Sequence, residues 1–144
     1  TLKDTNARTR WHIQLAMESR EADKLERLLR KQPRTPSVMM QLVLIRLLAL
    51  EGLDAAALEW RQRFETDKSL RNDPVWKVVH SRQPSLAAVA KLDRSDNNKA
   101  LICIELADRH PKLAVRFIEQ ARIYHRARDF PFQLVEQLLL QTEK

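Results

Sequence analysis

The sequence predicts an all-α fold: stacked antiparallel helical hairpins in a right-handed α-solenoid-like array of about eight to nine helices. Three observations favour this fold class. Only one glycine occurs in 144 residues. Strand signals are nearly absent, because the chain has no sustained apolar–polar alternation and no Asn-Gly or Asp-Gly hairpin turn. Gly52 and six prolines divide the chain at intervals typical of helical hairpins.

The punctuation residues place the expected helices in order along the chain. Ser37, Asp54 and Asp96 can accept hydrogen bonds from the free amides at helix starts. Pro111 and Pro131 suit the first turn of a helix, where the amide hydrogen has no intrahelical partner. The stretch DKSLRND, residues 67–73, predicts a loop. The expected helices cover residues 4–18, 20–32, 36–51, 53–67, 74–81, 84–93, 97–109, 111–128 and 131–142.

Length and composition predict one helical-repeat domain over residues 1–144, with a possible subdivision near 67–73. The chain is 44% hydrophobic, which is enough for one ordinary core. Its longest apolar run, residues 38–50, is too short to cross a bilayer, which needs about 20 residues, so we expect a central buried helix there and no membrane span. No signal peptide is visible, and a cytoplasmic or nuclear location is expected. Attachment to other domains of a longer chain stays open, because the sequence lacks an initiator Met.

An internal repeat supports the hairpin architecture. Residues 16–26, AMESREADKLE, align with residues 49–59, ALEGLDAAALE, at a shift of 33 and share five of eleven residues. Gly52 can take the left-handed conformation that ends a helix, and Ser19 occupies the same place in the first copy. The next acidic residue, Glu21 or Asp54, lies where the dipole of a new helix favours negative charge. Two helices joined by a tight turn are therefore predicted twice.

This repeat resembles the tetratricopeptide class. Gly52 followed five residues later by Ala57 matches the glycine and alanine spacing of that family, and the resemblance covers about residues 8–67. A HEAT-like or irregular helical array stays open, because the second half forms a hairpin around His110 and Pro111 without the 33-residue period. Both classes imply stacked hairpins that bind another molecule on an extended surface.

No pattern in the sequence indicates catalysis, a cofactor or a metal. The four histidines do not combine with other ligands at helical spacing, and one glycine cannot build a phosphate-binding loop. The only cysteine, Cys103, lies in an apolar run and is expected in the core. Trp11, Trp60 and Trp76 are also expected in the core or between helices. We therefore expect a protein that is not an enzyme.

Positive charge carries the functional prediction. Lysine and arginine number 26 against 19 acidic residues, for a net charge of +7. Four basic residues of helix 20–32 fall within about 60° of one another, and four of helix 111–128 lie on the side opposite the apolar stripe. These predicted partner-binding residues are Arg20, Lys24, Arg27, Lys31, Lys112, Arg116, Arg122 and Arg126. Helix stability does not explain the pair Arg20 and Lys24, because both lie near the positive end of their helix dipole.

Two functions remain open from the sequence. The first is a non-enzymatic helical-repeat scaffold that binds a protein or peptide partner of acidic character through these basic faces. The alternative is a nucleic-acid-binding module that contacts phosphates with the same faces without reading sequence. Helix 20–32 contains no aromatic residue, which disfavours base stacking on a single strand but not phosphate contact with a duplex.

Overall fold

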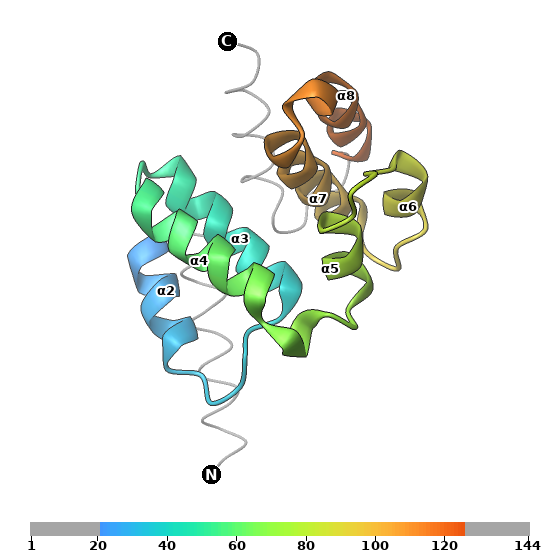
Figure 1. Cartoon of the computed structure of the whole chain (residues 1–144). Helices are drawn as coiled ribbons and strands as arrows, with labels where there is room; N and C mark the ends of the chain where they lie inside the picture. The colour runs from blue at the N-terminus through green and yellow to red at the C-terminus, as the bar shows by residue number, and fades with distance from the viewer. Residues whose placement is uncertain (1–20, 126–144) are drawn as a thin grey trace. The chain divides into compact units, whose positions relative to one another are not determined.

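The computed structural model describes residues 21–125 and is all-α (Figure 1). The described residues form seven α-helices and two short 3₁₀ helices, with no strand among them. The chain divides into two compact units, residues 1–63 and 64–144. The boundary lies inside helix α4 (Asp54–Thr66), before the loop predicted at residues 67–73. Stacking into a right-handed solenoid stays a prediction, since each unit is described by itself.

The first unit contains α2 (Ala22–Arg30), α3 (Val38–Leu50) and the start of α4. Helix α2 is amphipathic and buries Ala22, Leu25 and Leu29, whereas α3 is buried from residue 41 to residue 48. The central buried helix predicted for residues 38–50 is thus confirmed, whereas the wider bounds of 36–51 contract to Val38–Leu50. Among the described residues, no helix is long and apolar enough to span a membrane.

Gly52 ends α3 as the sequence predicts. Its φ of 79° lies in the left-handed region. The amide of Leu53 donates to the carbonyl of Leu48 at 2.9 Å, and the amide of Gly52 donates to that of Ala49 at 3.1 Å. This pair of bonds is the Schellman motif, which satisfies carbonyls that the helix end leaves free. The turn lets α4 begin two residues later.

Helix α2 begins with a cap from elsewhere in the sequence. Its N-cap residue, Glu21, makes no side-chain capping hydrogen bond. Instead the backbone amide of Ala22 donates to Oε1 of Glu51, the residue that follows α3, at 3.3 Å. The carboxylate of Glu51 therefore joins the start of α2 to the end of α3.

The second unit is built around α7 (Asp96–Arg109), which is buried from residue 100 to residue 107. Helices α5 (Pro74–Val79), α6 (Leu86–Ala90) and α8 (Ala114–Tyr124) pack on α7, most extensively α8. The 3₁₀ helices are η1 (Lys68–Leu70) and η2 (Pro111–Leu113). The hairpin predicted around His110 and Pro111 is confirmed as the α7–η2–α8 connection.

Three local predictions need correction. Ser95, not Asp96, caps α7, because Oγ of Ser95 accepts a hydrogen bond from the amide of Asn98. Asp54 is the first residue of α4 and supplies negative charge in its first turn. The helix predicted at 111–128 begins with the 3₁₀ turn η2, so α8 itself starts at Ala114. The predicted helices 4–18 and 131–142 lie outside the described residues.

Candidate functional site

The basic face of α2 is exposed. Lys24, Arg27 and Lys31 all lie on the surface of this helix or at its end, and Arg20 lies outside the described residues. Nζ of Lys24 pairs with Glu21 at 3.7 Å, so a local carboxylate offsets part of the unfavourable position of this cation. No ion pair joins Asp23 and Arg27 among the described residues, and Arg27 and Lys31 remain available to a partner.

Arg30 has a structural role at the end of α2. It pairs with Glu26, as the spacing predicts, and with Glu59 of α4, each at 3.0 Å. Its guanidinium also lies 5.2 Å from the ring centroid of Trp60, which is buried as expected for a core tryptophan. The hydrogen bond to Glu59, followed by that to Glu26, raises the pKa of Arg30. Arg30 thus joins α2 to α4.

The second predicted face is divided between two elements. Lys112 lies in η2, Arg116 in the first turn of α8 and Arg122 in its last turn, and all three are exposed. Arg126 lies outside the described residues. The dipole of α8 favours Arg122 but disfavours Arg116, so Arg116 is a cation that helix stability does not require.

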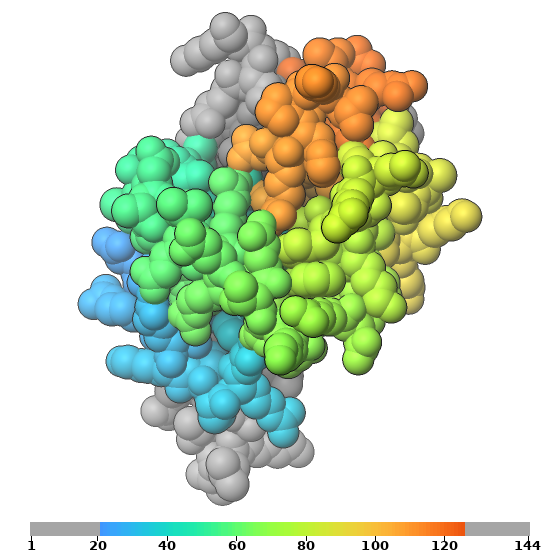
Figure 2. Space-filling view, in the orientation of Figure 1, coloured from blue at the N-terminus to red at the C-terminus, as the bar shows by residue number. Residues whose placement is uncertain are grey.

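Lys112 and Arg116 lie at two adjoining hollows on the second unit. The first hollow, of about 340 Å³, is lined by Pro84, Ser85, Leu86, Ala87, Leu113, Arg116 and Phe117. The second, of about 480 Å³, is lined by Arg82, Pro84, Arg109, His110, Pro111, Lys112 and Leu113. They share Pro84 and Leu113. We call the two hollows together the basic groove; in Figure 2 its walls belong to the yellow-green and orange parts of the surface.

The two walls of the basic groove are held by local hydrogen bonds. On one wall, the Ser81 hydroxyl lies 3.1 Å from the carbonyl of Gln83 and accepts from its amide, which shapes the loop before α6. Ser85 then caps α6 by accepting a hydrogen bond from the amide of Ala88. On the other wall, the amide of Leu113 donates to the carbonyl of His110 and closes the η2 turn. The groove is therefore formed by ordered backbone on both sides.

The basic groove is positively charged and contains no carboxylate in its lining. Arg82, Lys112 and Arg116 are exposed, and none forms an ion pair with a carboxylate in the part of the chain that the structure describes. Between these cations lie proline, leucine and phenylalanine side chains. An apolar floor with cations at its edge fits a ligand that has both an apolar and an anionic part.

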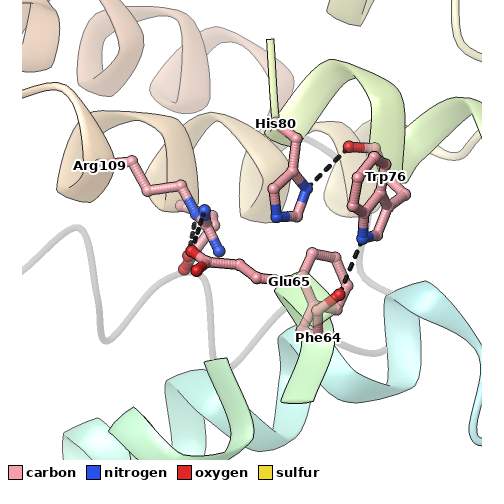
Figure 3. Close-up of polar contacts among 6 residues, drawn as sticks. Phe64, Glu65, Trp76, His80 and Arg109 are labelled. Carbon is pink, nitrogen blue, oxygen red and sulfur yellow. Dashed lines mark hydrogen bonds and ion pairs between the residues drawn. The ribbon is translucent and has the colours of Figure 1, made fainter. Parts of the chain in front are cut away.

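Arg109 of the second hollow is different, because two carboxylates neutralise it. Its Nε donates to Glu105 at 2.9 Å and its Nη1 to Glu65 at 3.0 Å (Figure 3). The side chain of Glu105 is 1% exposed and that of Glu65 is 49% exposed. Arg109 therefore holds a buried carboxylate in place through Nε and an exposed one through Nη1.

An aromatic cluster lies beside Arg109. The ring of His80 stacks on Trp76 with centroids 3.9 Å apart and on Phe64 with centroids 5.2 Å apart. Figure 3 shows His80 between Trp76 and Arg109, and the indole of Trp76 donates to the carbonyl of Phe64 at 2.8 Å. Burial lowers the pKa of His80, the charge of Arg109 lowers it further, and the carbonyl of Trp76 and the nearby carboxylates act against this. The neutral imidazole is thus favoured at neutral pH.

No group of three His, Cys, Asp or Glu side chains among the described residues is placed to hold a metal ion. Cys103 is buried, as predicted, and burial raises the pKa of its thiol to about 12. Because the thiolate is the nucleophilic form, the raised pKa and the burial of Cys103 disfavour it as a nucleophile.

Comparison with protein-family models, curated proteins and solved structures finds no match for this chain. The resemblance to the tetratricopeptide and HEAT-like classes therefore rests on the sequence pattern alone.

Sequence reasoning identified Lys112 and Arg116 but missed the opposite wall of the groove. Arg82, Pro84 and Leu86 belong to a short segment, SRQPSL, that carries no charge run and no helical stripe. The only available signal was the pair Pro84 and Pro111, each of which marks the start of a helix. Whether these two helix starts lie next to each other depends on how α6 and α8 pack on α7.

Proposed function

We propose that this chain is a non-enzymatic helical interaction module that binds an acidic segment of a protein partner in the basic groove. One observation carries the proposal: the exposed cations Arg82, Lys112 and Arg116 line the groove together with apolar side chains, without a carboxylate in the lining. Volumes of about 340 and 480 Å³ are those of sites that take side chains or small ligands. A peptide with acidic residues beside a leucine or phenylalanine would satisfy both features.

Unpaired cations in unfavourable positions add support. Lys112 and Arg116 lie near the start of the η2–α8 helical segment, where the dipole favours negative charge. An acidic partner would remove this local cost as it binds. Phe117 lines the first hollow but is only 2% exposed, so it offers no face for a stacked base.

The test is a binding titration with fluorescently labelled degenerate peptides. One library is rich in Asp, Glu, Leu and Phe, and a matched library has Lys in place of the acidic residues. We expect the acidic library to bind the chain and the variant Lys112→Gln/Arg116→Gln to bind it at least about fivefold more weakly. The control Lys77→Gln/Lys91→Gln removes the same charge at exposed positions outside the groove and should bind as the unaltered chain does.

Equal loss of affinity in the groove and control variants would show attraction to net charge alone and would overturn the proposed site. The face of α2 is tested separately with Arg27→Glu/Lys31→Glu, which we expect to fold normally. If only this variant loses affinity, the partner binds α2 and the groove assignment is wrong.

Nucleic acid is the competing partner, and salt dependence separates it from a peptide. A protein that neutralises Z phosphates of a duplex loses affinity with a log–log salt slope near −0.9Z. At physiological salt we expect no binding of duplex DNA that depends on Lys112 and Arg116. The variant Lys112→Gln/Arg116→Gln should therefore leave duplex binding unchanged. Tighter binding of duplex DNA than of the acidic library, with a steep slope that the variant reduces, would favour the alternative function.

A further inference from the structure

The second hollow of the basic groove has an unusual balance of charge. Arg82 and Lys112 both line it, and Arg116 lines the adjoining hollow. Arg109 and its partners Glu65 and Glu105 together carry one net negative charge. Arg82 and Lys112 exceed this by one positive charge, and Arg116 in the adjoining hollow raises the excess over the whole basic groove to two. A phosphoryl group, with a charge of about −1.5 to −2 at neutral pH, would offset more of this excess than one carboxylate.

The donors of this hollow also suit a phosphoryl group. The guanidinium of Arg82 presents a planar fork of N–H donors that can bind two oxygens together, and the ammonium of Lys112 adds up to three donors. A phosphoryl group has three acceptor oxygens, enough for both side chains at once. The half-buried His110 lines the same hollow and supplies a further ring nitrogen.

The first hollow identifies the source of the phosphoryl group. It adjoins the second through Pro84 and Leu113 and has an apolar floor that includes Leu86 and Phe117. A free phosphate ion would leave this floor uncovered. A phosphorylated peptide would place its phosphoryl group in the second hollow and a neighbouring apolar side chain in the first.

We infer that the basic groove recognises a phosphorylated residue of its peptide partner, with Arg82 and Lys112 binding the phosphoryl oxygens. This inference rests on the proposed function and specifies the anion that the groove prefers. Phosphorylation of the partner would then control the association, because each charge-assisted hydrogen bond to phosphate is gained only after modification.

The experiment uses three degenerate peptide libraries that differ at one fixed central position. That position is serine, glutamate or phosphoserine, and the flanking positions sample apolar and acidic residues. Fluorescence anisotropy with the whole chain should show the phosphoserine library binding about tenfold more tightly than the glutamate library. The variant Arg82→Gln/Lys112→Gln should reduce this preference to less than about twofold. Lys77→Gln/Lys91→Gln should preserve it.

The outcomes separate this inference from the proposed function. Equal binding of the glutamate and phosphoserine libraries, both weakened by Arg116→Gln, would overturn the phosphoryl preference and leave the acidic-peptide groove supported. Failure of every library to bind would overturn both. Inorganic phosphate is the last arm: if it displaces the phosphoserine library at equal concentration, the groove binds a free ion and the assignment of a phosphopeptide is wrong.

Discussion

The imidazole of His80 stacks on the indole of Trp76, four residues earlier, with ring centroids 3.9 Å apart and planes 18° from parallel. Nδ1 of the same imidazole lies 3.1 Å from the carbonyl oxygen of Trp76, to which it donates when protonated there. Trp76 thus fixes both the tautomer and the ring position of His80. Nε2 is then the unprotonated nitrogen; it is buried and has no hydrogen-bond partner among the described residues.

Acid should destabilise the second unit through His80. Its pKa is lowered from 6.5 in the folded chain, mainly by burial, so the unfolded chain binds more protons below that pH. The stabilising contribution is therefore complete above about pH 6.5 and is lost as the pH falls below it. The free energy of unfolding, measured with urea at several pH values, should fall on the acid side of 6.5.

The variant His80→Phe keeps an aromatic ring beside Trp76 and removes the titrating group, so its stability should change less with pH over the same range. His110→Gln serves as the matched control and should retain the acid slope. If His80→Phe shows the full slope, another group is responsible for the acid sensitivity.

Replacement of Arg109 should expose the cost of a buried carboxylate. Arg109→Met leaves Glu105, whose side chain is 1% exposed, without its guanidinium partner, and should reduce the free energy of unfolding by about 3 kcal/mol. The double variant Arg109→Met/Glu105→Leu removes the charge as well and should recover much of this loss. Glu65→Gln removes only the exposed partner and should cost less than about 1 kcal/mol. A double variant no more stable than Arg109→Met would show that packing, and not charge, sets the cost.

Gly52 should tolerate no ordinary side chain without conformational strain. A Cβ at this position would meet no atom within 4 Å, so the cost of Gly52→Ala comes from its φ of 79° alone. We expect a loss of about 1 kcal/mol in the free energy of unfolding, measured by circular dichroism in urea. Gly52→Asn should cost less, because asparagine adopts the left-handed region more readily. Equal losses for the two variants would contradict this explanation.

Two variants at the start of α7 should separate the contribution of the capping hydrogen bond from that of the helix dipole. Ser95→Ala removes the oxygen that accepts from the amide of Asn98 at 3.3 Å and should cost about 1 kcal/mol. Asp96→Asn removes only a negative charge from the first turn and should cost about 0.5 kcal/mol. Thermal or urea unfolding of both variants checks the order. A larger loss for Asp96→Asn would restore the assignment made from the sequence.

The elements were predictable because their punctuation is local. Pro74 begins α5 and Gly52 follows α3, as expected from residues whose backbone preferences act at one position. Short helices were harder to delimit. The helix predicted at 84–93 contracts to Leu86–Ala90, because Ser85 caps it after Pro84 and the amide of Leu92 already bonds three residues back in a turn.

Only one wall of the basic groove was predictable from the sequence, because the two walls come from segments that are far apart along the chain. Helical spacing identifies Lys112 and Arg116 within one segment, but Arg82 lies 30 residues before Lys112. The two walls meet because α6 and α8 pack on the same central helix, α7. Such packing has no local signature in a chain whose period of 33 residues does not extend into this half.

The hydrogen bond from Ala22 to Glu51 sets the smallest segment that can be transplanted intact. Residues 21–34 excised as a peptide would carry the apolar stripe of α2 but lose the acceptor for its first amide, since that acceptor follows α3. A chimaera that breaks the chain between residues 31 and 37 would separate donor from acceptor in the same way. Recombination between related sequences would therefore keep this cap when residues 21–51 are inherited together or when both parents carry a carboxylate at position 51.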